Sequence, residues 1–319
     1  MRNSSATATI DIADNTAPSP YVGRFAPSPT GPLHLGSLAT ALASALEARA
    51  RRGRWLIRIE DLDSSRRLPG MADQHLRTLE AYGFEWDGAV RVQSAHLDPH
   101  TEALERLRRL GRCYECTCSR AEISALRTET GDAGEEDLHY PGLCRSGPRH
   151  AGRARALRFL AEDREIAFDD RWQGHCVDNV ARSVGDFIVR RRDGIPAYQL
   201  AVVVDDAAQG VTDVVRGCDL LASTPRQILL QEALGFARPG YAHLPLIVAA
   251  DGTKLSKSSR AIGVAARDAG ATLLLVLNLL GQAPPGELAG APPAEVWTWA
   301  IAHWNAGPLR GRRSIRAPD

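Results

Sequence analysis

A strand–loop–helix–strand pattern in residues 21–63 constrains the fold most strongly. Residues 21–26 have the pattern of a short strand, and a loop rich in proline and glycine follows. A regular leucine spacing of four residues in the next, alanine-rich run predicts a helix, with leucines at Leu38, Leu42 and Leu46. Residues 55–59 then have the pattern of a second strand. This order predicts a right-handed crossover between two parallel strands, with ligands at their carboxyl ends.

The rest of the chain predicts more elements of a mixed α/β fold, interrupted by an irregular stretch from Cys113 to about Gly174 that resembles an inserted subdomain. Further helices are predicted over residues 73–82, 101–110 and 224–234, the last with Ser223 as N-cap, and beyond 263. Further strands are predicted over residues 186–190, 198–204, 211–216 and 243–249.

Composition excludes several classes of protein. The 319 residues include 39 Lys and Arg against 38 Asp and Glu, so a polyanion would have to bind a local basic face. Clusters at residues 106–112, 190–192 and 310–316 are candidates for such a face, and the sequence does not choose among them. Apolar runs such as Leu273–Leu277 are far too short to cross a membrane, and the first twenty residues have no signal-peptide pattern. We therefore expect a cytoplasmic protein that does not interact with membranes.

Cysteines gather in the predicted insert. Six in a chain of this length do not make a disulfide framework, but Cys116, Cys118 and Cys144 suit tetrahedral zinc. Ordinary zinc chemistry offers His139 or Cys113 as the fourth ligand. The alternative is a set of free structural cysteines.

Two loops carry candidate phosphate contacts. His34 and Gly36 lie at the start of the first helix, where backbone N–H groups and the positive helix end favour phosphate. The only two lysines of the chain, Lys254 and Lys257, follow the last predicted strand and could close over a triphosphate as mobile point charges. The alternatives are a packing histidine and a basic surface loop.

These segments resemble a known family. Residues 23–31, His34–Ser37, 59–63 and 254–258 are similar to the signature segments of class I glutamyl-tRNA synthetases, in the same order. The resemblance spans residues 21–259 and implies a Rossmann-type domain that joins glutamate to ATP as glutamyl adenylate, with release of pyrophosphate, before transfer to tRNA.

The length of the chain indicates which branch of this family it resembles. Only about 60 residues follow the lysine loop, too few for the helical anticodon-binding region of full-length enzymes. The chain is more similar to the short branch, the glutamyl-Q tRNA(Asp) synthetases, which activate glutamate without tRNA and transfer it to the queuosine base in the anticodon of tRNA(Asp). Two alternatives remain: a truncated glutamyl-tRNA synthetase that charges tRNA(Glu), and a catalytically silent RNA-binding paralogue stabilised by zinc.

The resemblance implies a domain order: a flexible tail (1–20), the first half of the catalytic domain (21–112), the zinc-bearing insert (113–184), the second half with the lysine loop (185–262), and a short helical extension and tail (263–319). It also implies three partners, ATP with Mg²⁺, L-glutamate and tRNA(Asp) bearing queuosine. We expect a monomer.

Site roles follow from the chemistry of glutamate together with the resemblance. Its side-chain carboxylate needs a guanidinium, which Arg24 and Arg216 supply with the Tyr198 hydroxyl, and its ammonium needs an anion, Glu60; surface ion pairs are the alternative. The other glutamate-binding residues implied are Phe25, Ala26, Pro27 and Ser28. The catalytic residues implied are His34, Gly36, Lys254 and Lys257, of which His34, Gly36 and Lys257 bind ATP. The resemblance adds Tyr140 to Cys116, Cys118 and Cys144 as ligands of one structural Zn²⁺.

Overall fold

The predicted crossover unit is confirmed. The structure, a computed structural model, describes residues 20–125, 139–249, 264 and 268–317. In it, β1 (Val22–Phe25), α1 (Leu35–Ala50) and β2 (Arg54–Ile59) follow one another, and β1 pairs with β2 in parallel. Strand β3 (Arg91–Val92) extends this sheet in the order β1-β2-β3. Gly53 makes the tight return possible, because a Cβ there would lie 2.4 Å from the Tyr21 carbonyl oxygen.

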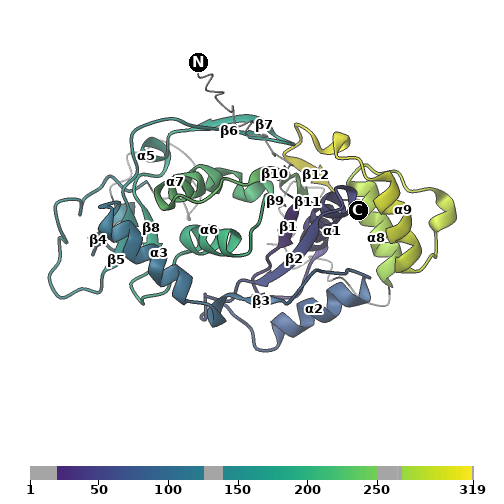
Figure 1. Cartoon of the computed structure of the whole chain (residues 1–319), viewed down its shortest axis with the longest axis horizontal. Helices are drawn as coiled ribbons and strands as arrows, with labels where there is room; N and C mark the ends of the chain where they lie inside the picture. Colours follow the sequence, from purple (N-terminus) through teal and green to yellow (C-terminus); the bar gives the residue numbers. More distant parts are fainter. Residues whose placement is uncertain (1–19, 126–138, 250–263, 265–267, 318–319) are drawn as a thin grey trace, which may run out of the picture.

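A second sheet continues from the first. Its order is β7-β6-β10-β9, in which β6 and β9 are parallel to β10 and β7 is antiparallel to β6. The bounds of these strands are Ile166–Asp170 (β6), Gly174–Asp178 (β7), Asp213–Gly217 (β9) and Gly240–Leu244 (β10). Val22 of β1 donates to Thr212 Oγ1 at 2.9 Å and accepts from the Thr212 N–H at 3.0 Å, just before β9. The two sheets therefore meet edge to edge, as Figure 1 shows.

A third, antiparallel sheet carries the cysteines. Its order is β4-β5-β8, with bounds Cys113–Cys116, Ala156–Phe159 and Phe187–Arg190. Two short helices flank it, α4 (Arg120–Ser124) and α5 (Val180–Ser183). Strands β6 and β7, which the sequence places in the same insert, pair instead with β10 of the second sheet.

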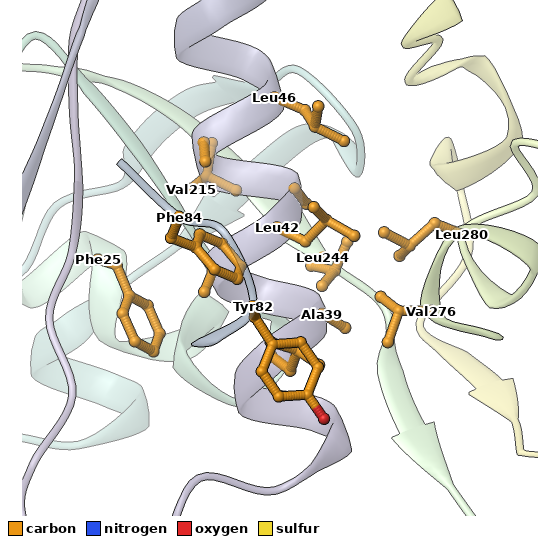
Figure 2. Close-up of a cluster of buried hydrophobic side chains, with 14 of the residues drawn as sticks. Phe25, Ala39, Leu42, Leu46, Tyr82, Phe84, Val215, Leu244, Val276 and Leu280 are labelled. Carbon is orange, nitrogen blue, oxygen red and sulfur yellow. The ribbon is translucent and has the colours of Figure 1, made fainter. Parts of the chain in front are cut away.

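Helix α1 is the centre of the main core. One side of it packs on β1, β2 and β9, and the other meets α8 (Ala269–Leu279) and α9 (Pro293–His303). Figure 2 shows Leu42 and Leu46 between Val215 on one side and Leu280 on the other. Burial of each such side chain contributes roughly 1.5–3 kcal/mol. This packing fixes α1, and with it the loop before α1, against the strand ends.

Four further helices of the described residues complete the core. They are α2 (Met71–Ala81), α3 (Asp98–Arg109), α6 (Tyr198–Ala208) and α7 (Thr224–Leu234). Three of them, α3, α6 and α7, pack against one another. Helix α7 begins at Thr224–Pro225 with Ser223 as its N-cap, as predicted. The Ser223 hydroxyl makes no capping bond and instead accepts from Gln199 and Arg226 at 3.0 and 3.3 Å. Within the described residues, no helix has both the length and the apolar character needed to cross a bilayer.

The predicted strand over residues 198–204 is wrong, because these residues begin helix α6. Three consecutive valines favour a strand by local propensity. In the fold, however, Leu200 to Asp206 are all buried, with α3, α7 and β8 packed around them. A run that is apolar on every side has neither helical nor strand periodicity, so tertiary packing decides its structure.

The predicted strand over residues 243–249 is divided at Pro245, which has no N–H to donate. Strand β10 ends at Leu244, and β11 (Leu246–Val248) pairs in parallel with β12 (Ser314–Arg316). The end of the chain that the sequence describes as a helical extension and tail thus also contributes a strand beside β11.

Candidate active site

One cavity of about 520 Å³ lies where the strands of the two larger sheets end. Its lining includes every described residue that the sequence assigns to glutamate or ATP: Arg24, Phe25, Ala26, Pro27, Ser28, His34, Gly36, Glu60, Tyr198 and Arg216. Lys254 and Lys257 lie outside the described residues. Strand β11, which precedes them, contributes Leu246 and Ile247 to the lining. The cavity therefore combines segments from both halves of the chain.

His34 is the N-cap of α1. Its Nδ1 accepts a hydrogen bond from the Ser37 N–H at 3.2 Å, so the proton of the neutral ring is on Nε2. Gly36 leaves room for this ring, because a Cβ at residue 36 would lie 3.1 Å from His34 Cε1, a tight contact. The loop thus presents an Nε2–H donor beside the positive end of a helix of sixteen residues.

A buried ionic network connects the residues that the sequence assigns to glutamate. Asp206 Oδ1 is 3.1 Å from Arg24 Nε and 2.7 Å from Arg58 Nη1. Arg58, whose side chain is fully buried, also contacts Glu60 Oε1 through Nη2 at 3.1 Å. One anion and one cation therefore connect Arg24 with Glu60, the two residues expected at opposite ends of a glutamate ligand.

The two carboxyl groups of this network differ in their electrostatics. Burial raises the pKa of Glu60, and Arg58 and Arg24 offset only part of that effect. For Asp206, burial also acts upward, but Arg24 and Arg58 outweigh it and lower the pKa. Asp206 is therefore the fixed counter-ion of the arginines, whereas the negative charge on Glu60 gains from a further cation such as a ligand ammonium.

Arg58 and Asp206 are not among the residues that the sequence predicts for the site. Asp206 follows the valine run, whose local pattern favours a strand although the run is part of helix α6. Arg58 is in β2 two residues before Glu60, so strand alternation puts both side chains on one face. The alternation of side chains along β2 is therefore the sequence signal that could have indicated Arg58.

Arg216, at the end of β9, is held by several acceptors. Its Nη1 donates to Gln227 Oε1 at 2.8 Å, and its Nη2 donates to Thr224 Oγ1 at 2.9 Å. Its Nε donates to His243 Nε2 at 3.0 Å. Arg216 is 4% exposed and lines the cavity, so its guanidinium is a preset cationic group rather than a surface charge.

Tyr198 is shared by two cavities. It is the first residue of α6, its side chain is 39% exposed, and it lines both the first cavity and a second one of about 660 Å³. The second cavity extends to Cys116 and Cys118 in the insert, and its basic lining residues are Arg120, Arg158, Arg191, Arg192 and Arg226. A polyanion bound there would adjoin the first cavity at Tyr198.

The three predicted cysteine ligands form a cluster. The sulfur atoms of Cys116, Cys118 and Cys144 are buried and all lie within 4.8 Å of one another, with 3.5 Å between those of Cys118 and Cys144. A tetrahedral ion with Zn–S bonds of ~2.3 Å would separate its thiolates by about 3.8 Å. The donors therefore fit a metal ion of this kind.

Of the three candidates for the fourth ligand, the described structure brings only Tyr140 to the cluster. Its hydroxyl is 3.3 Å from Cys116 Sγ and 3.7 Å from Cys118 Sγ. His139 instead contacts the Ala181 carbonyl through Nε2 at 3.1 Å, and Cys113 packs against a separate apolar core.

Two neighbours hold Tyr140. The Arg158 guanidinium lies 3.7 Å from the centre of its ring. Gly185, with φ +74°, lets the backbone of Tyr140 approach closely, since a Cβ at residue 185 would be 2.0 Å from the Tyr140 carbonyl oxygen. The backbone and ring contacts together orient the hydroxyl toward the sulfur atoms.

Comparisons with known proteins agree with this arrangement. The family model "tRNA synthetases class I (E and Q), catalytic domain" matches residues 21–280. The chain is 55% identical over 289 residues to a glutamyl-Q tRNA(Asp) synthetase from Thiobacillus denitrificans, covering 90% of this chain and 94% of the relative. It is 52% identical over 286 residues to one from Dechloromonas aromatica, with the same coverage.

Solved structures show the same fold. A crystal structure of a glutamate tRNA ligase from Elizabethkingia meningosepticum, in complex with its amino acid, matches with a TM-score of 0.76 at 27% identity. The match covers 93% of this chain and 67% of the other. A glutamate-tRNA synthetase from Elizabethkingia anophelis has a TM-score of 0.76 at 28% identity. The chain belongs to the family of class I tRNA synthetases for glutamate and glutamine, and within it to the glutamyl-Q tRNA(Asp) synthetases.

Proposed function

We propose that this chain activates L-glutamate with ATP, without needing tRNA, and transfers it to the queuosine base in the anticodon of tRNA(Asp). In the first step, an α-carboxylate oxygen of glutamate attacks the α-phosphorus of ATP. The new O–P bond gives glutamyl adenylate, and the bond to the β-phosphate breaks to release pyrophosphate. In the second step, a hydroxyl oxygen of the modified base attacks the acyl carbon and forms an ester. The bond between the acyl carbon and the phosphate oxygen breaks to release AMP, and the proton of the hydroxyl passes to solvent.

A single observation carries the proposal: one cavity is lined both by the start of helix α1 and by the charged residues Arg24, Arg216 and Glu60. At the helix start, His34 Nε2–H and the backbone before α1 are fixed donors for phosphate oxygens. Lys254 and Lys257 would add mobile positive charge, and Mg²⁺ bound with ATP would neutralise phosphate oxygens. Gly36 keeps His34 in place.

The glutamate contacts follow from the charges. Arg24 and Arg216 face the cavity as guanidinium groups for the side-chain carboxylate, with Tyr198 as a further donor. Glu60 would bind the ammonium. Burial raises the pKa of Glu60 and so disfavours its negative charge, and the ammonium would stabilise that charge. Residues Phe25 to Ser28 would surround the substrate through the loop after β1.

We further propose one structural Zn²⁺ bound by Cys116, Cys118, Tyr140 and Cys144. The apolar cluster around these residues is small, so a metal bridge would supply much of the stability of the insert. We also propose that the chain acts as a monomer in the cytoplasm, where ATP and tRNA are available.

The test is to follow labelled glutamate. The chain is incubated with ATP, labelled L-glutamate and tRNA(Asp) that either carries or lacks queuosine, and the tRNA is then digested to locate the label. We expect label in the anticodon fragment only when queuosine is present. In a parallel incubation with tRNA(Glu), label on its 3′ end would indicate a truncated glutamyl-tRNA synthetase instead. No adenylate at all would indicate a silent RNA-binding paralogue.

A further inference from the structure

His243 occupies a fully buried position in β10, behind the cavity wall. Its Nδ1 is 2.6 Å from Asp170 Oδ2, and its Nε2 is 3.0 Å from Arg216 Nε. Asp170 belongs to β6, and Arg216 belongs to β9. Three adjacent strands therefore bring a carboxylate, an imidazole and a guanidinium into line.

The proton positions in this line are determined by chemistry. An arginine side chain has N–H groups and no acceptor, so the Arg216 Nε–H must donate and His243 Nε2 must accept. His243 therefore carries its proton on Nδ1, which donates to Asp170. Burial lowers the pKa of His243 to about 4, so the ring stays neutral at physiological pH. A doubly protonated ring would have no acceptor for Arg216.

Asp170 is itself held in one orientation. Its Oδ1 accepts from the backbone N–H groups of Gln173, Trp172 and His243 at 2.8, 3.0 and 3.1 Å. Its Oδ2 is then the oxygen that faces His243. The turn after β6 thus fixes the carboxylate, the carboxylate fixes the imidazole tautomer, and the imidazole accepts from the guanidinium.

Arg216 depends on this acceptor for its direction. Its bonds to His243, Gln227, Thr224 and the Leu220 carbonyl use four of its five N–H groups among the described residues. The acceptor of the Nε bond, His243, lies in strand β10. The other three acceptors lie in α7 and in the turn before it. Loss of the Nε acceptor would let the planar group rotate away from the cavity.

We propose that His243 and Asp170 are positioning residues that orient Arg216 toward the side-chain carboxylate of glutamate, with Asp170 selecting the required tautomer of His243. This inference rests on the proposed function, because it needs glutamate as the ligand of Arg216. Neither His243 nor Asp170 lines the cavity, so both act through Arg216.

The test is the nearly isosteric substitution Asp170→Asn. Three backbone N–H groups require an acceptor at the Oδ1 position, so the new NH₂ group must occupy the Oδ2 position and donate to His243 Nδ1. The ring proton then moves to Nε2 and opposes the Arg216 Nε–H. We expect KM for glutamate in pyrophosphate exchange to rise roughly ten- to a hundredfold, while KM for ATP changes by less than about twofold.

The matched control is Asp169→Asn, one residue earlier. Asp169 is 87% exposed and pairs with the exposed His175, so this variant should keep the wild-type KM for glutamate. Nitrogen NMR of the histidines supplies a readout that does not depend on activity: His243 should be protonated on Nδ1 in the wild type and on Nε2 in Asp170→Asn.

Three outcomes would overturn the inference in an active wild-type enzyme. One is an unchanged KM for glutamate in folded Asp170→Asn, and another is a wild-type His243 protonated on Nε2. If Asp170→Asn does not fold, His243→Gln replaces it: a KM for glutamate equal to that of His243→Leu would show that no acceptor is needed. A wild-type chain without glutamate-dependent exchange would contradict the proposed function itself, which separates the two failures.

Discussion

Asp206 forms an ion pair with Arg24, which lines the first cavity, although the two residues are 182 positions apart in the chain. The carboxylate comes from helix α6 and the guanidinium from strand β1, and their atoms are 3.1 Å apart. Arg58 binds the same Asp206 oxygen at 2.7 Å. One carboxylate from the second half of the chain therefore holds two arginines from the first half.

Asp206→Asn should both destabilise the fold and weaken glutamate binding. Without the carboxylate, Arg24 loses the ion pair with Asp206, and buried Arg58 keeps its contacts with Glu60 Oε1 and Gln209 Oε1. We expect a loss of about 3–5 kcal/mol in the free energy of unfolding and a KM for glutamate raised roughly tenfold. Thermal denaturation and pyrophosphate exchange measure the two effects.

The neighbouring Asp205 provides the control for that experiment. It is equally buried and pairs with Arg91 and His100, outside the lining of the cavity. Asp205→Asn should therefore lower the melting temperature and keep the KM for glutamate. Equal KM values for the two variants would show that Asp206 serves stability alone.

Gly36→Ala should impair adenylate formation. The added Cβ would lie 3.1 Å from His34 Cε1, so the ring must shift away from its N-cap position. We expect kcat of pyrophosphate exchange to fall roughly ten- to a hundredfold. Gly31→Ala is the control, because Gly31 also lines the cavity and a Cβ there meets no atom within 4 Å. Similar losses in both variants would argue against a role for the His34 ring position.

Metal content tests the cysteine cluster. Purified protein should contain one zinc ion per chain by elemental analysis, and Cys144→Ser or Tyr140→Phe should reduce that content after dialysis against a chelator. His139→Ala and Cys113→Ser should retain the metal, because both side chains contact other groups. Retention in Tyr140→Phe together with loss in His139→Ala would assign the fourth position to histidine.

Acid should destabilise the fold through His243. In the unfolded chain its pKa is about 6.5, whereas burial lowers the folded pKa to about 4. The unfolded state therefore binds the proton first, so this contribution is present above pH 6.5 and is lost as the pH falls to about 4. Its size is about 3 kcal/mol.

Urea denaturation at several pH values measures this effect. His243→Gln should have a shallower decline of the free energy of unfolding between pH 6.5 and 4 than the wild type. The groups facing the His243 ring include Asp170, Arg216, Tyr241 and the Thr224 hydroxyl, and all of these are retained in the variant. Identical slopes in both proteins would contradict a neutral, buried His243.

The sequence predicts local structure well where the signal is local. The four-residue leucine period of α1 and the proline–glycine loop before it suffice to predict the crossover. The run from Leu200 to Val204 does not suffice, because burial on all sides removes the periodicity that separates a helix from a strand.

The charged network behind the site could not be predicted in the same way. Its partners are far apart along the chain, as with Asp170 and His243 at a separation of 73 residues. Nothing in the local pattern around either residue indicates the other. Only the pairing of β6, β10 and β9 brings them together. The resemblance to a family predicts residues that line the cavity, and the structure shows the buried residues that hold them.

The most direct test of the central claim is pyrophosphate exchange with purified protein, ATP, Mg²⁺ and L-glutamate in the absence of any tRNA. If one cavity holds ATP and glutamate together, label from pyrophosphate should enter ATP when L-glutamate is present and should not do so with L-aspartate in its place. No exchange with L-glutamate, or exchange that appears only after tRNA is added, would contradict the account.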